Sequence, residues 1–309
     1  GTKVFIAPDS FDFEVSRVVR HTMRHVSLFI CILLMAGAAV LIGSRGQSPS
    51  NQELGEQQAT CSPQENGQAA LIQCGDHAVL IDAGSAHDAP ALLQELEDRQ
   101  VTRLDARVLS YFSPLRMGGA AQVLRSIPTE AVYAPDYDPP ADSQGDYRRL
   151  LQAIEDAGIP VQPPDEKGDT LTLGDAQLTL ERPLQGHYEA TEGDYSLAAS
   201  LEHGVFSFLF PGDAGEQRLG ELMAQLPLSH TVLVLPEQGA VHENTEAFLR
   251  AVDPQAAVLT GAKAPSEELL TLLNGMEDLK LRDLYCTADG DLTFTSNGLD
   301  ELTITQAEK

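Results

Sequence analysis

Basic residues are scarce in this chain of 309 residues, which has 20 Lys and Arg against 46 Asp and Glu and a formal net charge of −26. A field of that sign repels phosphate backbones, so it disfavours non-specific nucleic-acid binding over a broad surface. Cysteine is also scarce. The four cysteines include no C-x-x-C pair, which excludes a zinc-ribbon or thioredoxin-like protein.

The apolar residues are numerous enough for a large core. They make up 42% of the chain, which excludes a mainly disordered protein. The length fits two domains of about 150 residues, and it fits equally well one α/β domain of about 250 residues with an appendage. No internal repeat of fixed period is present in the sequence.

One long apolar run lies near the N-terminus, at residues 26–43, between Arg24 and Arg45. Its eighteen residues carry no formal charge and span about 27 Å as a helix, enough for the core of a bilayer. A buried helix of a soluble domain normally has a polar stripe. A cleaved signal peptide is a second alternative, because residues 36–38 have suitable small side chains. The run continues past that point to Gly43, which favours an uncleaved transmembrane anchor.

The arginines around this run predict its orientation. Arg17, Arg20 and Arg24 precede it, and only Arg45 follows closely. Cytoplasmic flanks are enriched in basic residues, so we expect a single-pass membrane protein with a cytoplasmic N-terminus and an extracytoplasmic C-terminal domain.

The chain is thereby divided into four predicted segments: a cytoplasmic segment (1–25), the transmembrane anchor (26–43), a polar tether (44–57) and the exported domain (58–309). The part after residue 46 contains 15 basic and 43 acidic residues, so the negative charge of −28 lies on the exported side.

Strand-like and helix-like patterns alternate beyond the tether. Short apolar runs predict strands at 69–74, 77–81, 106–110, 131–134, 175–180, 196–201, 205–210, 231–235, 257–259 and 292–295. Helical spacing predicts helices at 91–100, 119–126, 147–157, 216–226, 245–252 and 267–273. Clusters of strands with intervening helices predict an α/β (α+β) domain with two sheets covered by helices.

A series of short motifs follows this pattern in a specific order. The motifs are LIDAGS (80–85), VLS (108–110), GGA (118–120), DYSL (194–197), SFLFPGDA (207–214) and TVL (231–233). The series resembles the metallo-β-lactamase fold superfamily, in particular the extracytoplasmic hydrolase-like domain of ComEC-type competence proteins. The resemblance spans about residues 58–300. It implies an αββα sandwich with two face-to-face sheets and helices outside.

The resemblance also implies an H-x-H-x-D-H metal-binding motif just before the Gly-Gly pair. The corresponding residues here are Tyr111, Ser113, Leu115 and Arg116. Leu115 has no lone pair, and Arg116 brings a permanent positive charge to a place where a cation would bind.

The downstream metal-binding motifs are altered as well. The implied Pro-His-His-Gly-Ser contains Glu237 and Gln238 in place of the two histidines, and the last implied His corresponds to Ala264. Of the implied metal ligands only Asp213 is retained, with Asp82 as a nearby supporting acid. One carboxylate plus Glu237 does not make the three or four ligands of a zinc site. We therefore expect a vestigial cleft without a cofactor.

Three alternatives concern single residues of this cleft. A relocated zinc or manganese site would use Asp82, Asp213, Glu237 and His242, with His203 as a further candidate, although a solvated loop is the ordinary explanation for His242. Asp213 can instead cap a helix that begins three residues later. Arg116 can fill the vacated site and pair with Asp213 or Glu237, or it can be a surface residue.

The cysteines give one modest expectation. Cys61 and Cys74 lie thirteen positions apart on two segments that can be antiparallel strands, and the exported side permits oxidation, so a disulfide is a candidate. Cys286 is expected to be a buried small hydrophobic residue.

Two classes of function follow. The first is a binding or interaction module, an anchored and catalytically silent domain that meets an unknown protein or small-molecule ligand at the old cleft. The second is a ComEC-like metallohydrolase of the phosphodiesterase or nuclease type with a reduced or relocated metal site. A role in DNA uptake belongs to this second class. The altered ligands favour the first class, and the charge of −28 weakens a DNA hydrolase. One membrane span cannot form the multi-span channel of ComEC-type proteins.

Overall fold

The computed structural model describes residues 57–60, 69–261, 264–290 and 292–307. The expected anchor at 26–43, the segment 1–25 and the tether up to residue 56 lie outside the described residues. Within the described part, no helix combines the length and the apolar character needed to cross a membrane.

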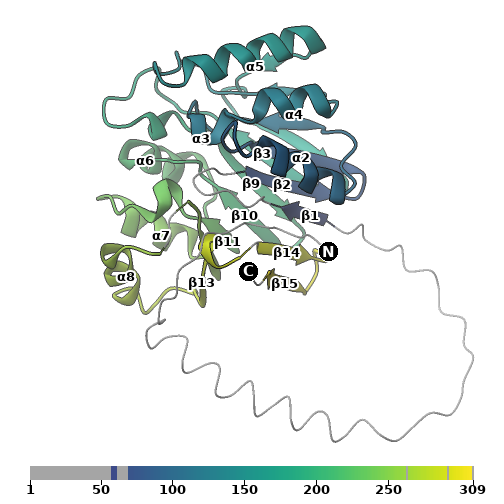
Figure 1. Ribbon diagram of the computed structural model, residues 1–309. Helices are drawn as coiled ribbons and strands as arrows, with labels where there is room; N and C mark the ends of the chain where they lie inside the picture. Colours follow the sequence, from purple (N-terminus) through teal and green to yellow (C-terminus); the bar gives the residue numbers. More distant parts are fainter. Residues whose placement is uncertain (1–56, 61–68, 262–263, 291, 308–309) are drawn as a thin grey trace, which may run out of the picture. The chain divides into compact units, whose positions relative to one another are not determined.

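One sheet has eight strands in the described part of the chain (Figure 1). From edge to edge they are β15 (Leu302–Gln306), β14 (Leu292–Ser296), β1 (Gln57–Thr60), β2 (Ala69–Cys74), β3 (His77–Asp82), β4 (Ala106–Val108), β5 (Val132–Tyr133) and β6 (Val161–Gln162). The strands from β15 to β3 pair antiparallel, and the strands from β3 to β6 pair parallel.

The other sheet has seven strands among the described residues. They are β13 (Asp283–Cys286), β12 (Ala256–Leu259), β11 (Val232–Val234), β10 (Phe206–Phe210), β9 (Ala198–His203), β8 (Ala176–Glu181) and β7 (Asp169–Leu173). Strands β10 to β13 are parallel, and the rest pair antiparallel. Each sheet therefore contains a block of parallel strands whose carboxyl ends share one edge.

Helices cover the outer face of each sheet. The eight-stranded sheet packs against α2 (Ala89–Asp98), α3 (Pro114–Met117), α4 (Ala120–Ser126) and α5 (Gln144–Ala157). The seven-stranded sheet packs against α6 (Glu216–Gln225), α7 (Thr245–Val252) and α8 (Glu267–Asn274). Three short 3-10 helices lie in the connections: η1 (Glu192–Tyr195), η2 (Pro236–Gly239) and η3 (Thr287–Asp289).

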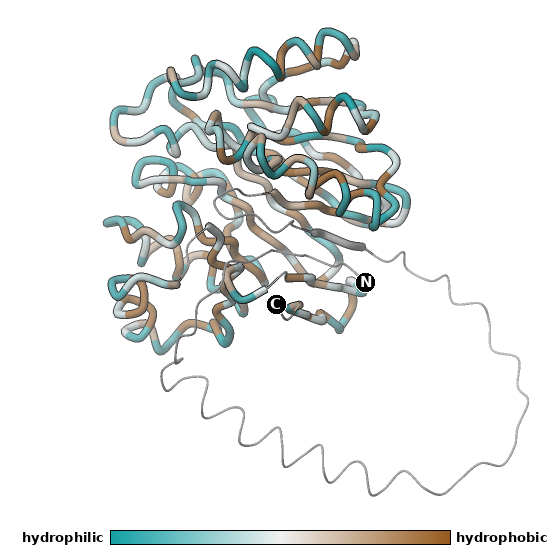
Figure 2. The backbone as a smooth tube through the Cα atoms, in the orientation of Figure 1, coloured by the Kyte–Doolittle hydropathy of each residue, from teal (hydrophilic) through white to brown (hydrophobic). Residues whose placement is uncertain are grey.

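Side-chain alternation along the strands produces three apolar layers. Figure 2 shows the apolar segments of the strands and helices in brown. In β2, Ile72 faces the layer between the two sheets, where it joins Phe208. Its neighbour Leu71 faces the opposite way, toward Leu92 of α2. On the far side, Leu209 packs with the α6–α8 layer. The expected αββα sandwich is therefore confirmed, because each sheet buries both of its faces.

Cys74 is not part of a disulfide in this structure, in contrast to the candidate pairing with Cys61. Its thiol is buried and free, and burial raises its pKa well above the ordinary value. In the β1–β2 ladder Cys74 is opposite Gln57, whereas Thr60 is opposite Leu71. The structure therefore does not pair Cys74; Cys61 lies outside the described residues. Cys286 is buried, as expected.

Arg107 is an unusual feature of the helix-covered face of β4. It is fully buried, and Nη1 of its side chain donates to the carbonyl oxygen of Ala120 at 3.4 Å. Its Nε and Nη2 atoms are buried and have no hydrogen-bond partner among the described residues. Burial lowers the pKa of Arg107 to about 9, although the charge of Asp82 opposes the shift. An uncompensated buried cation costs stability, so Arg107 is a weak point of the fold.

We expect Arg107→Met to raise the free energy of unfolding by about 1–3 kcal/mol, because methionine keeps most of the volume and removes the unpaired N–H groups. Chemical denaturation of both proteins measures the difference. Arg107→Ala is the control, since it removes the charge but leaves a cavity. A destabilised methionine variant would show that Arg107 has a partner we have not identified.

Candidate functional site

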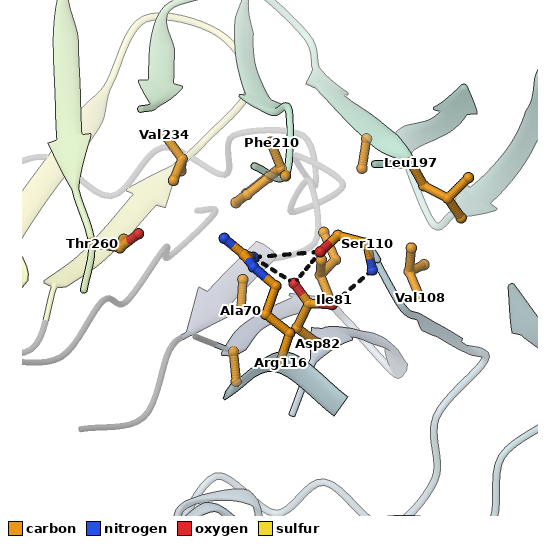
Figure 3. Close-up of a pocket in the computed structure, with 13 residues that line it drawn as sticks. Ala70, Ile81, Asp82, Val108, Ser110, Arg116, Leu197, Phe210, Val234 and Thr260 are labelled. Atoms are coloured by element: carbon orange, nitrogen blue, oxygen red, sulfur yellow. Dashed lines mark hydrogen bonds and ion pairs between the residues drawn. The ribbon is translucent and has the colours of Figure 1, made fainter. Parts of the chain in front are cut away.

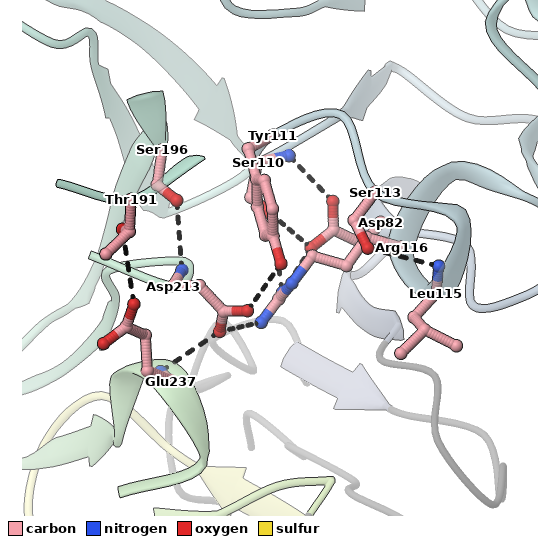
Figure 4. Close-up of polar contacts among 10 residues, drawn as sticks. All are labelled: Asp82, Ser110, Tyr111, Ser113, Leu115, Arg116, Thr191, Ser196, Asp213 and Glu237. Carbon is pink, nitrogen blue, oxygen red and sulfur yellow. Dashed lines mark hydrogen bonds and ion pairs between the residues drawn. The ribbon is translucent and has the colours of Figure 1, made fainter. Parts of the chain in front are cut away.

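The predicted site residues meet where parallel strands of both sheets end. Asp82 is the last residue of β3, and Ser110 follows β4 by two positions. Asp213 follows β10, and Glu237 follows β11. Crevices outside the carboxyl ends of parallel strands are common ligand sites in α/β folds. Figure 4 shows these side chains together at one edge of the sandwich.

Arg116 occupies the centre of this edge. Its side chain is only 6% exposed. Nη1 donates to Oδ2 of Asp82 at 2.7 Å, and Nη2 donates to Oδ1 of Asp213. Because Asp82 belongs to one sheet and Asp213 follows a strand of the other, one guanidinium joins both sheets. We call the trio Asp82, Arg116 and Asp213 the arginine clasp.

The short helix α3 aims Arg116 at these carboxylates. Ser113 is its N-cap, and the Ser113 hydroxyl accepts a hydrogen bond from the backbone N of Leu115 at 3.3 Å. Pro114 occupies the first turn, where its missing N–H costs nothing. One turn of helix then turns Leu115 outward, 40% exposed, and Arg116 inward.

Asp82 is the most deeply held member of the clasp. It is 2% exposed and has a left-handed φ of 59°. Its Oδ1 accepts from the backbone N of Ser110 and its Oδ2 from the Ser110 hydroxyl, both at 2.7 Å. Burial raises the pKa of Asp82, and the charge of Arg116 and the Ser110 hydrogen bonds oppose that shift. These donors over-determine an otherwise unfavourable backbone conformation.

The pKa of Arg116 shifts upward. Burial alone lowers it, but the carboxylates of Asp213 and Asp82 outweigh burial and hold the pKa above its ordinary value. Arg116 is therefore a permanent cation between two anions.

Asp213 collects donors from three directions. The Tyr111 hydroxyl donates to its Oδ2 at 2.8 Å, and the backbone N of Glu237 donates to its Oδ1 at 3.1 Å. Burial and the charge of Asp213 raise the pKa of Tyr111 well above its ordinary range, so this phenol stays protonated. Tyr111 acts here as a donor to the carboxylate and also lies beside the guanidinium of Arg116, 5.3 Å from ring centroid to Cζ.

The helix-capping alternative for Asp213 is wrong. Helix α6 begins after Gly215 and has no side-chain cap at that position. Its first turn is instead served by Asp194, whose Oδ1 accepts from the backbone N of Arg218 at 2.9 Å. Asp194 is part of the DYSL motif, so this motif caps the first turn of α6. Asp213 binds Arg116 instead.

Glu237 and His242 form a second polar pair beside the clasp. Glu237 has a left-handed φ of 46° and binds Nε2 of His242 through Oε2. Thr191 donates to its Oε1 at 3.4 Å. The side chains of Glu237 and His242 are 20% and 24% exposed, so the pair faces solvent. Arg116 pairs with Asp82 and Asp213, whereas Glu237 has a different partner.

The remaining candidates do not join the clasp. Gln238 and Ala264 are exposed. His203 lies at the far end of β9, about 16 Å along the strand from Ala198. It bonds to Ser296 at 3.0 Å, and burial lowers its pKa. His203 is therefore a buried structural histidine, and its proposed membership of a relocated metal site is wrong.

The donor set does not fit the zinc or manganese that the fold resemblance implies. Both remaining carboxylates, Asp82 and Asp213, already bind the guanidinium of Arg116. A divalent cation would have to displace a covalently attached cation whose charge repels it. In the part of the chain that the structure describes, no three His, Cys, Asp or Glu side chains form a group suited to a metal ion.

A small cavity of about 40 Å³ lies between the sheets beside the clasp (Figure 3). It is lined mainly by apolar side chains, with Asp82, Ser110, Arg116 and Thr260 as its polar members. The hydroxyl of Thr260 is buried, and no residue that the structure describes forms a hydrogen bond with it. The volume suffices for a few water molecules at most, so the cavity is no substrate pocket.

Four polar residues at this edge were not predicted from the sequence as site residues: Ser110, Thr191, Ser196 and Thr260. Ser110 was visible as the last residue of the VLS motif, and Ser196 as part of DYSL. The Ser196 hydroxyl accepts from the backbone N of Asp213 at 3.0 Å. Thr260 had no comparable signal, because a threonine after a strand is common.

We expect Arg116→Met to lower the free energy of unfolding by about 3–5 kcal/mol, because it leaves the buried carboxylate of Asp82 and the partly buried carboxylate of Asp213 without their cation. Adding Asp82→Asn and Asp213→Asn should restore most of the loss, since no charge then remains in the clasp. Denaturant titration of the single and triple variants checks this. If the single variant loses less than about 1 kcal/mol, the clasp is not a significant stabilising element.

Comparison with known proteins supports the fold. A scan against protein-family models and a search of curated proteins return no match. Among solved structures, the chain is similar to the metallo-β-lactamase fold protein YhfI from Bacillus subtilis, with 14% identity and a TM-score of 0.52 over 78% of this chain and 100% of that one.

Two other solved structures are similar at lower scores. A diphosphatase from the PhnP family has 11% identity and a TM-score of 0.46, over 78% of this chain and 98% of that one. A metallo-β-lactamase from Cronobacter sakazakii has 15% identity and a TM-score of 0.40, over 56% of this chain and 72% of that one. From the sandwich architecture and the match to YhfI, we conclude that this chain has the metallo-β-lactamase fold.

Proposed function

We propose that this protein is a catalytically silent member of the metallo-β-lactamase fold, a pseudo-hydrolase that acts as a binding or interaction module. The observation that carries the proposal is the arginine clasp. Arg116 pairs with both Asp82 and Asp213 at the place where the fold resemblance implies a metal ion. The cation is thus retained in the fold without the chemistry of a metal.

The groups at this edge lack the means for hydrolysis. A metallohydrolase lowers the pKa of a bound water and polarises the scissile group. The guanidinium of Arg116 is occupied by two carboxylates, so it has little capacity left to polarise a substrate. Tyr111 is a protonated phenol that donates to Asp213. Neither group supplies a nucleophile at neutral pH.

The same edge has groups suited to recognition. Glu237 and His242 are partly exposed beside the clasp, and Leu115 lies exposed nearby on α3. The clasp holds the loops that present these side chains. We propose that an unknown protein or a small-molecule ligand binds here. The charge of −26 favours a cationic partner over a nucleic acid.

We further propose that residues 26–43 anchor the chain in a membrane with the domain on the extracytoplasmic side. The uncharged length of the run and the arginines before it support this topology. A relation to ComEC-type proteins rests on the order of the sequence motifs.

A ComEC-like metallohydrolase of the phosphodiesterase or nuclease type is the second candidate, with a possible link to DNA uptake. The observation in its favour is the Glu237–His242 pair, because a carboxylate and an imidazole that face solvent are ordinary ligands for zinc or manganese. A metal site built on the Glu237–His242 pair needs further ligands from residues outside the clasp.

We expect the purified protein to bind no stoichiometric zinc or manganese and to hydrolyse neither phosphodiesters nor β-lactams. The physical reason is the donor set, in which Arg116 occupies both carboxylates. Elemental analysis after dialysis, together with activity assays in added metal, measures both quantities.

The matched control restores the implied ligands by Tyr111→His, Ser113→His, Leu115→Asp and Arg116→His. Metal in this variant but not in the parent would show that the scaffold still accepts the site. Near-stoichiometric metal in the parent, with turnover that is lost in Asp213→Ala, would falsify the pseudo-hydrolase proposal and support the hydrolase.

The topology is tested separately. Protease added to intact cells or spheroplasts should remove the domain after residue 46, because that part lies outside the cytoplasm. A cytoplasmic protein in the same cells is the control for lysis. If the domain is cleaved only after the cells are broken, the proposed orientation is wrong.

A further inference from the structure

A second cavity lies away from the clasp, at the end of the parallel block of the eight-stranded sheet. Its volume is about 190 Å³. Three of its walls follow consecutive parallel strands: Leu109 and Phe112 after β4, Ala134 to Asp136 after β5, and Pro163 after β6. Helix α5 forms the remaining wall. Crevices at the carboxyl ends of parallel strands are where α/β sheets commonly bind ligands.

Most of the side chains that line this cavity are apolar, and polar atoms make up about half of the surface that it exposes. Phe112, Leu109, Leu150 and Ile154 line it, and the ring of Tyr147 closes one side. Phe112 and Tyr147 pack with ring centroids 4.8 Å apart, so the aromatic wall is well defined. The volume is large enough for one six-membered ring or a branched aliphatic group of similar size.

The mouth of the cavity exposes apolar surface. Leu151 of α5 is 38% exposed and Val161 of β6 is 44% exposed, and both line the cavity. Large apolar side chains at the surface are unremarkable when single, but here two of them flank one opening. A ligand that enters would remove this surface from water, which favours binding.

The charge at the mouth is negative. Asp136 is the charged residue among the side chains that line the cavity, and none of the described lining residues is basic. Burial raises the pKa of Tyr147, and the charges of Asp138 and Asp136 add to the shift. A cation at this opening is attracted by the carboxylate of Asp136.

We propose that this cavity binds a small amine, with an apolar ring or branched aliphatic group inside and a protonated amino group at Asp136. The apolar side chains of the lining contact the body of the ligand, and the carboxylate selects its charge. The site is separate from the clasp, because Phe112 faces this cavity while its neighbour Tyr111 binds Asp213. The proposal therefore does not rest on the proposed function.

The test is isothermal titration calorimetry of the full chain with three probes of one shape: benzylamine, benzyl alcohol and benzoate. We expect benzylamine to bind about tenfold more tightly than benzyl alcohol, and benzoate to give no signal, because the carboxylate repels it. Asp136→Asn should remove the advantage of benzylamine over benzyl alcohol. Asp76→Asn is the matched control, since Asp76 is exposed in the turn between β2 and β3.

A second variant tests the cavity itself. Ala134→Leu adds volume to one wall and should weaken benzylamine and benzyl alcohol alike by tenfold or more, with thermal unfolding as the check that the protein is folded. Equal affinity for the three probes, unchanged binding in Asp136→Asn, or no binding of benzylamine would each overturn the proposal. So would a dimer in sedimentation that Val161→Ser converts to monomer while benzylamine fails to bind, because the apolar mouth then faces a second copy.

Discussion

The guanidinium of Arg116 between two carboxylates is the interaction on which the functional edge of this protein depends. Asp82 ends a strand of one sheet, and Asp213 follows a strand of the other, so the clasp joins the two halves of the sandwich. Asp213 in turn holds the backbone of Glu237 and the hydroxyl of Tyr111. Without the central cation, these loops would gather around one buried and one partly buried negative charge.

The clasp differs from a metal centre in the properties that matter for catalysis. A catalytic zinc keeps an open coordination position for water. The Nη1 and Nη2 atoms of Arg116 instead donate hydrogen bonds to oxygen atoms of the protein. The two carboxylates accept further hydrogen bonds from the protein. Asp82 accepts one from the Ser110 hydroxyl, and Asp213 accepts one from the Tyr111 hydroxyl and one from the backbone N of Glu237. The polar groups of the clasp are consequently occupied by one another, which suits a surface for recognition better than a reaction centre.

Much of the fold was predictable because strand alternation and motif order are local properties of the sequence. The helix at Thr245–Val252 agrees to the residue, and the stop of α5 at Gly158 follows from a left-handed C-cap. Strand β1 and the four edge strands β6, β7, β13 and β15 were missed. Edge strands are partly exposed, so they lack the apolar runs on which the prediction relied. The convergence of Asp82, Arg116 and Asp213 was foreseeable from the motifs. The choice of Asp82 over Glu237 as the second partner of Arg116 was not, because it depends on how one turn of helix aims a long side chain.

The clasp also changes what the domain requires from its surroundings. A structural metal must be captured from solution, so a fold held by one loses stability when chelators or competing ions deplete the supply. Arg116 is synthesised with the chain at a fixed ratio of one to one and does not dissociate. This protein therefore carries its central cation into any compartment, irrespective of how much trace metal is available there.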